Sequence, residues 1–242
     1  MIQFKNLVKR FGERTILNGL SLEVKKGEIL FILGTSGTGK SVLLKNIVGL
    51  LRPDEGQIWI DGQEVSKLSE EEYLPVRKKC GMVFQHPALF DSLTIYENVA
   101  FGLRRHYNLP EVEIQEKVRN ALAMVHLQGI EQKMPAAISY GMQKRVSLAR
   151  TVALEPLILL FDEPTTGLDP ITTNAVNQLI LDLSRSLKTT SMVVSHDMHC
   201  ALSIADRIVV LDKGEIVALG TPEEMKNCEV PLVKEFMAEV VA

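Results

Sequence analysis

Alternating strands and helices are predicted from the spacing of apolar residues along the chain. Continuous apolar runs at residues 29–33 and 157–161 are typical of strands buried on both faces. A 3.6-residue apolar period at 42–49 predicts a helix directly after the first of these strands. Further strands and helices of this pattern are predicted at residues 80–84, 170–187, 191–195, 197–205 and 207–211. This alternation indicates an α/β fold with a mainly parallel sheet and helices on both faces.

The N-terminal region departs from this alternation. Between Ile2 and Val24, short apolar runs are broken by turn sequences at 11–13 and at Asn18-Gly19, which predicts antiparallel strands. Another strand is predicted at 57–60, before the hairpin sequence Asp61-Gly62. We therefore expect a small antiparallel β layer beside the parallel sheet, and we interpret the single tryptophan, Trp59, as a core residue.

A mostly helical pattern runs through residues 86–154, which are predicted to form an inserted helical subdomain. Pro110 is expected to be the first residue of one of its helices. The buried face of that helix is predicted to contain Ile114, Val118, Ala121, Leu122 and Val125. The whole chain, 1–242, is then a single domain in which 1–85 and 155–220 form the α/β core and 221–242 form a C-terminal helical tail.

Two further helix starts are marked by capping sequences. Ser69 and Glu72 have the spacing of a capping box, in which each residue bonds the backbone of the other. Thr221 and Glu224 have the same spacing, with Pro222 at the first helical position.

Composition and charge exclude several classes of protein. The hydrophobic fraction of 46% and the charged fraction of 24% exclude a disordered or fibrous chain, and a net charge of −3 gives no reason to expect nucleic acid as a partner. The three cysteines show no paired spacing, which is typical of a reducing compartment. No apolar run is long enough to cross a bilayer, and the N-terminus lacks a signal sequence. We expect a cytoplasmic protein that reaches any membrane by docking.

A phosphate-binding loop is the strongest chemical signal. The stretch between the first predicted buried strand and its helix fits the pattern G-x-x-x-x-G-K-[S/T], in which glycines let successive backbone N–H groups point at one anion. Lys40 would add a positive charge at the β and γ phosphates, and the Ser41 hydroxyl would bind Mg²⁺. The loop residues are Gly34, Thr35, Ser36, Gly37, Thr38, Gly39, Lys40 and Ser41. The sequence therefore predicts nucleotide binding.

An acidic pair follows the apolar run at 157–161. A buried parallel strand delivers its last residues to the sheet edge at which the phosphate loop opens. Asp162 is then expected to hold Mg²⁺ opposite Ser41, directly or through water. Glu163 is placed to orient or deprotonate the water that attacks the γ-phosphate.

The order of these motifs resembles the ATP-binding-cassette (ABC) ATPases over nearly the whole chain. The motifs are the phosphate loop, Gln85, Ser139-Tyr140-Gly141, Asp162-Glu163, Asp169 and His196. The resemblance implies that Phe11 stacks on adenine, that Gln85 responds to the metal and the attacking water, and that His196 contacts the γ-phosphate. A core phenylalanine, a surface glutamine and a hydrogen-bonded structural histidine are the alternative interpretations of these three residues.

The resemblance also implies a homodimer that binds ATP and Mg²⁺. In this family, the sequence Leu-Ser-Gly-Gly-Gln holds the γ-phosphate bound to the other subunit, and Ser139 and Gly141 match it here. Asp169, in the loop 167–169, would cross to the partner. Tyr140 departs from the family pattern, because a bulky side chain replaces a glycine that permits close backbone approach. We expect Tyr140 to slow hydrolysis or to alter closure of the dimer.

Residues around the motifs resemble the ATPase subunits of lipid transporters that work with MCE-domain proteins. These stretches are at residues 40–45, 88–93, 97–99 and 141–146. The resemblance implies a multi-pass permease, an MCE-domain lipid-binding protein and phospholipid movement between membranes. We expect the chain at the cytoplasmic face of the inner membrane, and we expect residues 85–105 to form the surface that docks on the permease. The ATPase of a small-molecule importer and a soluble ABC ATPase acting on nucleic acid or ribosomes are the alternatives.

Two other groups of residues, one of histidine and cysteine and one of basic residues, are not expected to form binding sites. His196, His199 and Cys200 lie close in sequence, but we do not expect a metal site there. The basic pairs at 104–105 and 144–145 are interpreted as solvated faces.

Overall fold

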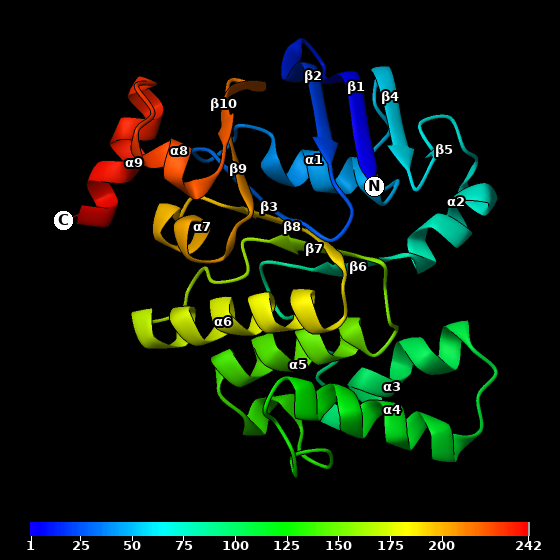
Figure 1. Ribbon diagram of the computed structural model, residues 1–242. Coiled ribbons are helices and arrows are strands. Elements are labelled where there is room, and N and C mark those ends of the chain that lie inside the picture. The colour runs from blue at the N-terminus through cyan, green and yellow to red at the C-terminus, as the bar shows by residue number, and fades with distance from the viewer. Residues whose placement is uncertain (242) are drawn as a thin grey trace.

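Two β-sheets and a set of surrounding helices make up the computed structural model, which describes residues 1–241 (Figure 1). The larger sheet has the strand order β10-β9-β3-β8-β7-β6, and only β10 runs antiparallel to its neighbour. Its strands are β3 (Ile29–Leu33), β6 (Cys80–Val83), β7 (Ile158–Asp162), β8 (Thr190–Ser195), β9 (Arg207–Asp212) and β10 (Glu215–Gly220). The predicted α/β fold is confirmed.

Both faces of this sheet are buried, as the continuous apolar runs predicted. Side chains alternate across a strand. In β3, Leu30 and Ile32 join one hydrophobic core, whereas Ile29, Phe31 and Leu33 join the other. The first core is shared with the smaller sheet and the second with the helices on the opposite face.

The smaller sheet is antiparallel, with the order β2-β1-β4-β5. Its strands are β1 (Ile2–Phe11), β2 (Arg14–Val24), β4 (Glu55–Ile60) and β5 (Gln63–Glu64). The predicted turn at Asn18-Gly19 is wrong. Gly19 has a positive φ of 68° inside β2, and the N–H of Asn18 bonds the carbonyl of Gly214 at 3.0 Å. The core interpretation of Trp59 is also wrong, because its ring is partly exposed, with Lys5 Nζ 4.8 Å from the ring centroid.

Helix α1 (Lys40–Ile47) lies between the two sheets and packs Leu43, Leu44 and Ile47 into the core that they share (Figure 1). The other helices are α2 (Glu70–Lys78), α3 (Ile95–His106), α4 (Glu111–Met124), α5 (Tyr140–Val152), α6 (Pro170–Ser186), α7 (Met198–Ile204), α8 (Pro222–Lys226) and α9 (Pro231–Val241), with a 3₁₀ turn at Pro135–Ala137. Helices α3, α4 and α5 pack together at the side of β6, below the sheet in Figure 1. Among the described residues, 1–241, no helix is long and apolar enough to cross a membrane.

The predicted helix starts are confirmed in part. Reciprocal capping boxes form at Ser69 with Glu72 and at Thr221 with Glu224. Pro110, however, precedes α4 as its N-cap, with a ψ of 149°, so the first helical residue is Glu111. The predicted buried face is confirmed, since the five residues assigned to it are at most 3% exposed, although Val125 follows α4 as its C-cap.

Candidate functional site

The phosphate loop joins the end of β3 to α1 in a conformation that depends on glycine. Gly37 and Gly39 have φ values of 83° and 100°, which side-chain-bearing residues rarely adopt. A Cβ on Gly34 would lie 2.6 Å from Thr38 Oγ1 and 2.7 Å from the carbonyl oxygen of Leu211. Thr38 in turn donates to the carbonyl of Thr35 at 2.9 Å. The loop therefore arrives directly at the N-terminus of α1, where free backbone N–H groups favour an anion.

Lys40, the first residue of α1, has a buried and positively charged side chain that contacts the loop. Its Nζ donates to the carbonyls of Gly34 at 2.6 Å and Thr35 at 3.1 Å, and it lies 3.7 Å from Glu163 Oε1. Burial lowers the pKa of Lys40, and the neighbouring charge of Glu163 opposes that shift. A cation held between carbonyls and a carboxylate can be shared with phosphate oxygens that enter the loop.

Ser41 and Asp162 meet across the loop. Ser41 Oγ donates to Asp162 Oδ1 at 2.6 Å, and the Asp162 side chain is buried at the end of β7. A hydroxyl and a carboxylate are oxygen ligands of the kind that Mg²⁺ prefers, and Mg²⁺ commonly completes its shell with water and substrate phosphates. Within residues 1–241, no group of three or more His, Cys, Asp or Glu side chains could hold a metal ion by itself. The pair fits a Mg²⁺ ion that arrives with a nucleotide.

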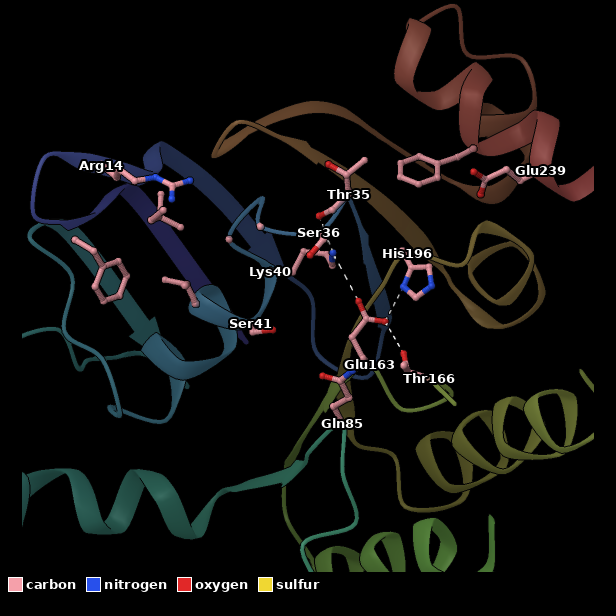
Figure 2. A pocket seen from close by; sticks show the side chains of 16 residues that line it. Arg14, Thr35, Ser36, Lys40, Ser41, Gln85, Glu163, Thr166, His196 and Glu239 are labelled. Carbon is pink, nitrogen blue, oxygen red and sulfur yellow. Dashed lines mark hydrogen bonds and ion pairs between the residues drawn. The ribbon is translucent and has the colours of Figure 1, made fainter. Parts of the chain in front are cut away.

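Glu163 is fixed by its backbone and by two side chains. It has a φ of 49°, and its N–H donates to the carbonyl of Val194 at 2.9 Å. Its Oε2 accepts from Thr166 Oγ1 at 3.1 Å and lies 2.9 Å from His196 Nδ1 (Figure 2). Because a carboxylate only accepts, the Nδ1 proton of His196 points to Glu163, and Nε2 is left free.

A cavity of about 760 Å³ gathers these side chains. Loop residues 35–37 and 39–41 line it together with Phe11, Gln85, Glu163 and His196 (Figure 2). Phe11 is 48% exposed, so the interpretation of a core phenylalanine is wrong. Gly34, Thr38 and Asp162 do not line the cavity but support the residues that do, through the contacts described above.

Ser139, Gly141 and Asp169 lie in a different place. Together with Tyr140 they line a second cavity, of about 410 Å³, and none of them lines the first. Ser139 caps α5 by accepting from the N–H of Met142 at 3.3 Å, and Asp169 caps α6 by accepting from those of Ile171 and Thr172. The Thr172 hydroxyl also donates to Asp169, at 2.6 Å, and this bond, followed by the backbone N–H bonds, holds the pKa of Asp169 below its usual range. Within one chain, Ser139, Gly141 and Asp169 therefore lie in a different cavity from the phosphate loop.

Several residues of the first cavity were not predicted from the sequence. Arg14 and Thr166 lie close in sequence to Phe11 and Glu163, and the hairpin pairing of Phe11 with Arg14 was the available signal. Phe236 and Glu239 come from α9, where no local pattern indicates proximity to the phosphate loop (Figure 2).

The interpretation of the pair at 144–145 as a solvated face is wrong for Lys144. Its side chain is 4% exposed, and its Nζ donates to the carbonyls of Gln85 at 2.5 Å and Pro164 at 3.0 Å. Burial lowers the pKa of Lys144 to about 8. The sequence does not indicate that Lys144 is buried, because the carbonyls that accept its hydrogen bonds are distant in sequence.

Comparison with known proteins gives consistent matches. The model of the ABC transporter family matches residues 17–166. The "Intermembrane phospholipid transport system ATP-binding protein MlaF" of Haemophilus influenzae is 44% identical over 98% of this chain and 90% of its own length. The "Probable ribonucleotide transport ATP-binding protein mkl" of Mycobacterium leprae is 41% identical over 98% of this chain and 68% of its own length.

A solved structure of the same fold contains products of ATP hydrolysis. A dimeric ATP-binding cassette in a post-hydrolysis state, bound to ADP and Pi, superposes with a TM-score of 0.84 at 34% identity. The match covers 92% of this chain and 99% of that one.

Proposed function

This chain belongs to the ABC transporter family and is an ATPase, and from that premise we propose that it drives a transporter of phospholipids or other lipids between membranes. The near full-length similarity to a phospholipid transport ATPase carries the proposal of a lipid cargo. A relative named for ribonucleotide transport is almost as similar, so a small-molecule importer is kept as the second candidate.

The contacts in the larger cavity support a role for each predicted residue. We propose that the loop N–H groups and Lys40 bind the phosphates, with adenine against the exposed ring of Phe11. Ser41, Asp162 and Gln85 would hold Mg²⁺, which neutralises phosphate charge when bound. Glu163 accepts the proton of the attacking water, and His196 orients Glu163 through Nδ1. A contact of His196 with the γ-phosphate would need a second ring proton, on Nε2, because phosphate oxygens only accept.

The active form is proposed to be a homodimer. Ser139 and Gly141 line a cavity separate from the phosphate loop, so they can complete an ATP site only on a second copy. The N-terminus of α5 would then face the γ-phosphate held by the partner's loop. Closure of two copies around ATP would do work on a permease, and hydrolysis would release them.

Exposed aromatic side chains support the proposed docking surface at residues 85–105. Phe90 and Phe101 are 42% and 48% exposed, and their ring centroids lie 4.7 Å apart. A paired, exposed aromatic patch is typical of a protein interface. The chain would be held by a multi-pass permease at the cytoplasmic face of the inner membrane, with an MCE-domain protein as the lipid-binding component.

Co-purification tests the cargo and the docking surface together. The parent chain, Phe101→Asp and Val112→Asp would each be purified from native membranes in mild detergent, with bound proteins and lipids identified by mass spectrometry. We expect the parent to recover a permease, an MCE-domain protein and phospholipid. Phe101→Asp should lose at least about 90% of the permease, because one buried unpaired charge costs several kcal/mol. Val112→Asp is the matched control, since Val112 is 74% exposed and lies on α4 outside the docking surface.

Each other outcome of this experiment selects another function. Recovery of a permease without an MCE-domain protein or lipid would favour the importer. Recovery of ribosomes or DNA would favour a soluble ABC ATPase. Equal loss of the permease in both variants would contradict the docking surface and leave the cargo result intact.

Tyr140 is the departure from the family pattern whose effect can be measured. Its ring is 39% exposed, its hydroxyl lies 3.4 Å from His86 Nδ1, and Lys144 Nζ is 5.5 Å from its centroid. We expect Tyr140→Gly to hydrolyse ATP about three- to tenfold faster with its partners present, because removal of the ring lets a phosphate approach the N-terminus of α5. Tyr140→Phe, which keeps the ring, should hydrolyse ATP at the parent rate. If Tyr140→Gly is no faster than the parent, the ring does not limit hydrolysis.

A further inference from the structure

Two cations of α5 hold the segment that follows β6. Arg150 donates from Nη1 to the carbonyl of Ala88 at 2.8 Å and from Nη2 to that of Pro87 at 3.1 Å. Lys144 donates to the carbonyl of Gln85 at 2.5 Å. Ala88 has a φ of 48°, which is strained for a residue with a side chain, so these bonds hold a conformation that the segment does not favour on its own.

Lys144 makes one contact that Arg150 does not. Its Nζ also donates to the carbonyl of Pro164, the residue after Glu163, at 3.0 Å. The ammonium group of Lys144 therefore connects two segments. One contains Gln85, which lines the larger cavity, and the other contains Glu163, the proposed catalytic carboxylate. Arg150, six residues further along the same helix, bonds the segment after β6 and, among residues 1–241, no other loop.

The burial of this ammonium is costly, and the charge of Glu163 offsets that cost only in part. Lys144 is 4% exposed, and none of the ion pairs in the described part of the chain includes it. An isolated buried cation is unfavourable unless hydrogen bonds satisfy it. A leucine or methionine would fill the space between α5 and the two loops without that cost, but it would remove the donor from the carbonyls of Gln85 and Pro164.

We propose that Lys144 is a positioning residue for ATP hydrolysis. By joining the segment at Gln85 to the loop at Pro164, it holds the side chains of Gln85 and Glu163 at a fixed separation across the cavity. This inference rests on the proposed roles of Gln85 and Glu163. A misplacement of about 1 Å at a reacting group can reduce a rate by about a hundredfold.

Hydrogen–deuterium exchange tests the connection without requiring hydrolysis. In Lys144→Met, we expect amides in residues 84–93 and in residues 163–169 to exchange about tenfold faster than in the parent. In Arg150→Met, only residues 84–93 should exchange faster. Lys117→Met is the matched control, because Lys117 lies on α4 and pairs with Glu155 at the surface, and neither segment should change. A folded Lys144→Met with parent exchange in residues 163–169 would overturn the proposal.

Steady-state kinetics then separates positioning from stability. We expect kcat of Lys144→Met to fall about ten- to a hundredfold, with KM for ATP and the dissociation constant for ATP within about twofold of the parent. Lys144→Gln, which keeps a neutral donor, should recover part of kcat. A kcat within twofold of the parent in Lys144→Met, or an equal loss of kcat and ATP affinity in both variants, would overturn the proposal.

Lys144→Gln decides the question if Lys144→Met does not fold. The glutamine side chain is shorter than lysine and carries no charge. We therefore expect the amides of at least one of the two segments to exchange faster in Lys144→Gln than in the parent, and kcat to be lower. Parent values for both quantities would overturn the proposal. Absence of hydrolysis by the parent chain would contradict the ATPase assignment, and the exchange measurement would still decide the role of Lys144.

Discussion

Replacement of Glu163 by glutamine should reduce ATP hydrolysis by about 10²–10⁴-fold, the range typical of a lost general base. ATP affinity should stay within about twofold of the parent. Glutamine has the shape of glutamate, and its side-chain oxygen can still accept from Thr166, whose Oγ1 lies 3.1 Å from Oε2. What is lost is the ability to accept a proton from water. The left-handed backbone at this residue, with a φ of 49°, is retained as well.

Binding and turnover are measured separately for this variant, by equilibrium titration with ATP and by phosphate release. Glu155→Gln is the matched control, because Glu155 is also a glutamate with a positive φ, of 52°, but lies at the surface in an ion pair with Lys117. We expect the control to hydrolyse ATP at the parent rate. Glu163→Gln should also accumulate as a dimer with ATP, since the bound nucleotide is not consumed. Hydrolysis within about threefold of the parent would show that another group takes the proton.

The fold was predictable where one physical pattern dominates the sequence. β3 and β7 are buried on both faces, so their apolar runs are uninterrupted and their ends are well marked. The capping boxes at Ser69 and Thr221 were predictable because both partners lie within four residues of each other. The phosphate loop is equally local, since its glycines and the N-terminus of α1 follow one another along the chain.

The remaining features depend on residues distant in sequence. Asn18-Gly19 has the composition of a turn, but the N–H of Asn18 bonds the carbonyl of Gly214, which is distant in sequence, and both residues lie within β2. Lys144 looks like a surface cation because the two carbonyls that satisfy it belong to Gln85 and Pro164. Phe236 reaches the cavity only because α9 packs beside α7. The local spacing of apolar and polar residues does not predict contacts between segments that are distant in sequence.

The site itself was predictable to the extent that its residues follow strand ends. Ser41 and Asp162 are 121 positions apart, yet they meet at 2.6 Å. Asp162 ends β7 at the edge of the parallel sheet at which the loop after β3 leads into α1, which contains Ser41. The separation of Ser139 from the phosphate loop was expected from the family resemblance and not from local pattern. The distance between two cavities is a property of the folded chain.

Lys40→Met should weaken ATP binding by about a hundredfold or more. Lys40 Nζ is held by the carbonyls of Gly34 and Thr35 at the centre of the loop, where two phosphate oxygens would become its partners. Hydrogen bonds to charged groups contribute about 1.5–3 kcal/mol each, and about 3 kcal/mol corresponds to more than a hundredfold in affinity. Isothermal titration with ATP and Mg²⁺ measures the loss.

The loss should not reflect unfolding, because the charge on Lys40 is a cost to the folded chain. Burial lowers the pKa of Lys40 below its unfolded value, so the charged form of this side chain costs folding free energy, and methionine removes that cost. In exchange, Glu163, 3.7 Å away, loses a cation, and the carbonyls of Gly34 and Thr35 lose a donor that the loop can replace with water. We therefore expect the Tm to stay within about 4 °C of the parent. Lys45→Met, on the same helix but outside the cavity, is the matched control and should bind ATP as the parent does. If Lys40→Met folds and binds ATP as tightly as the control, the loop backbone alone supplies the binding energy, and the assignment of Lys40 to the phosphates is wrong.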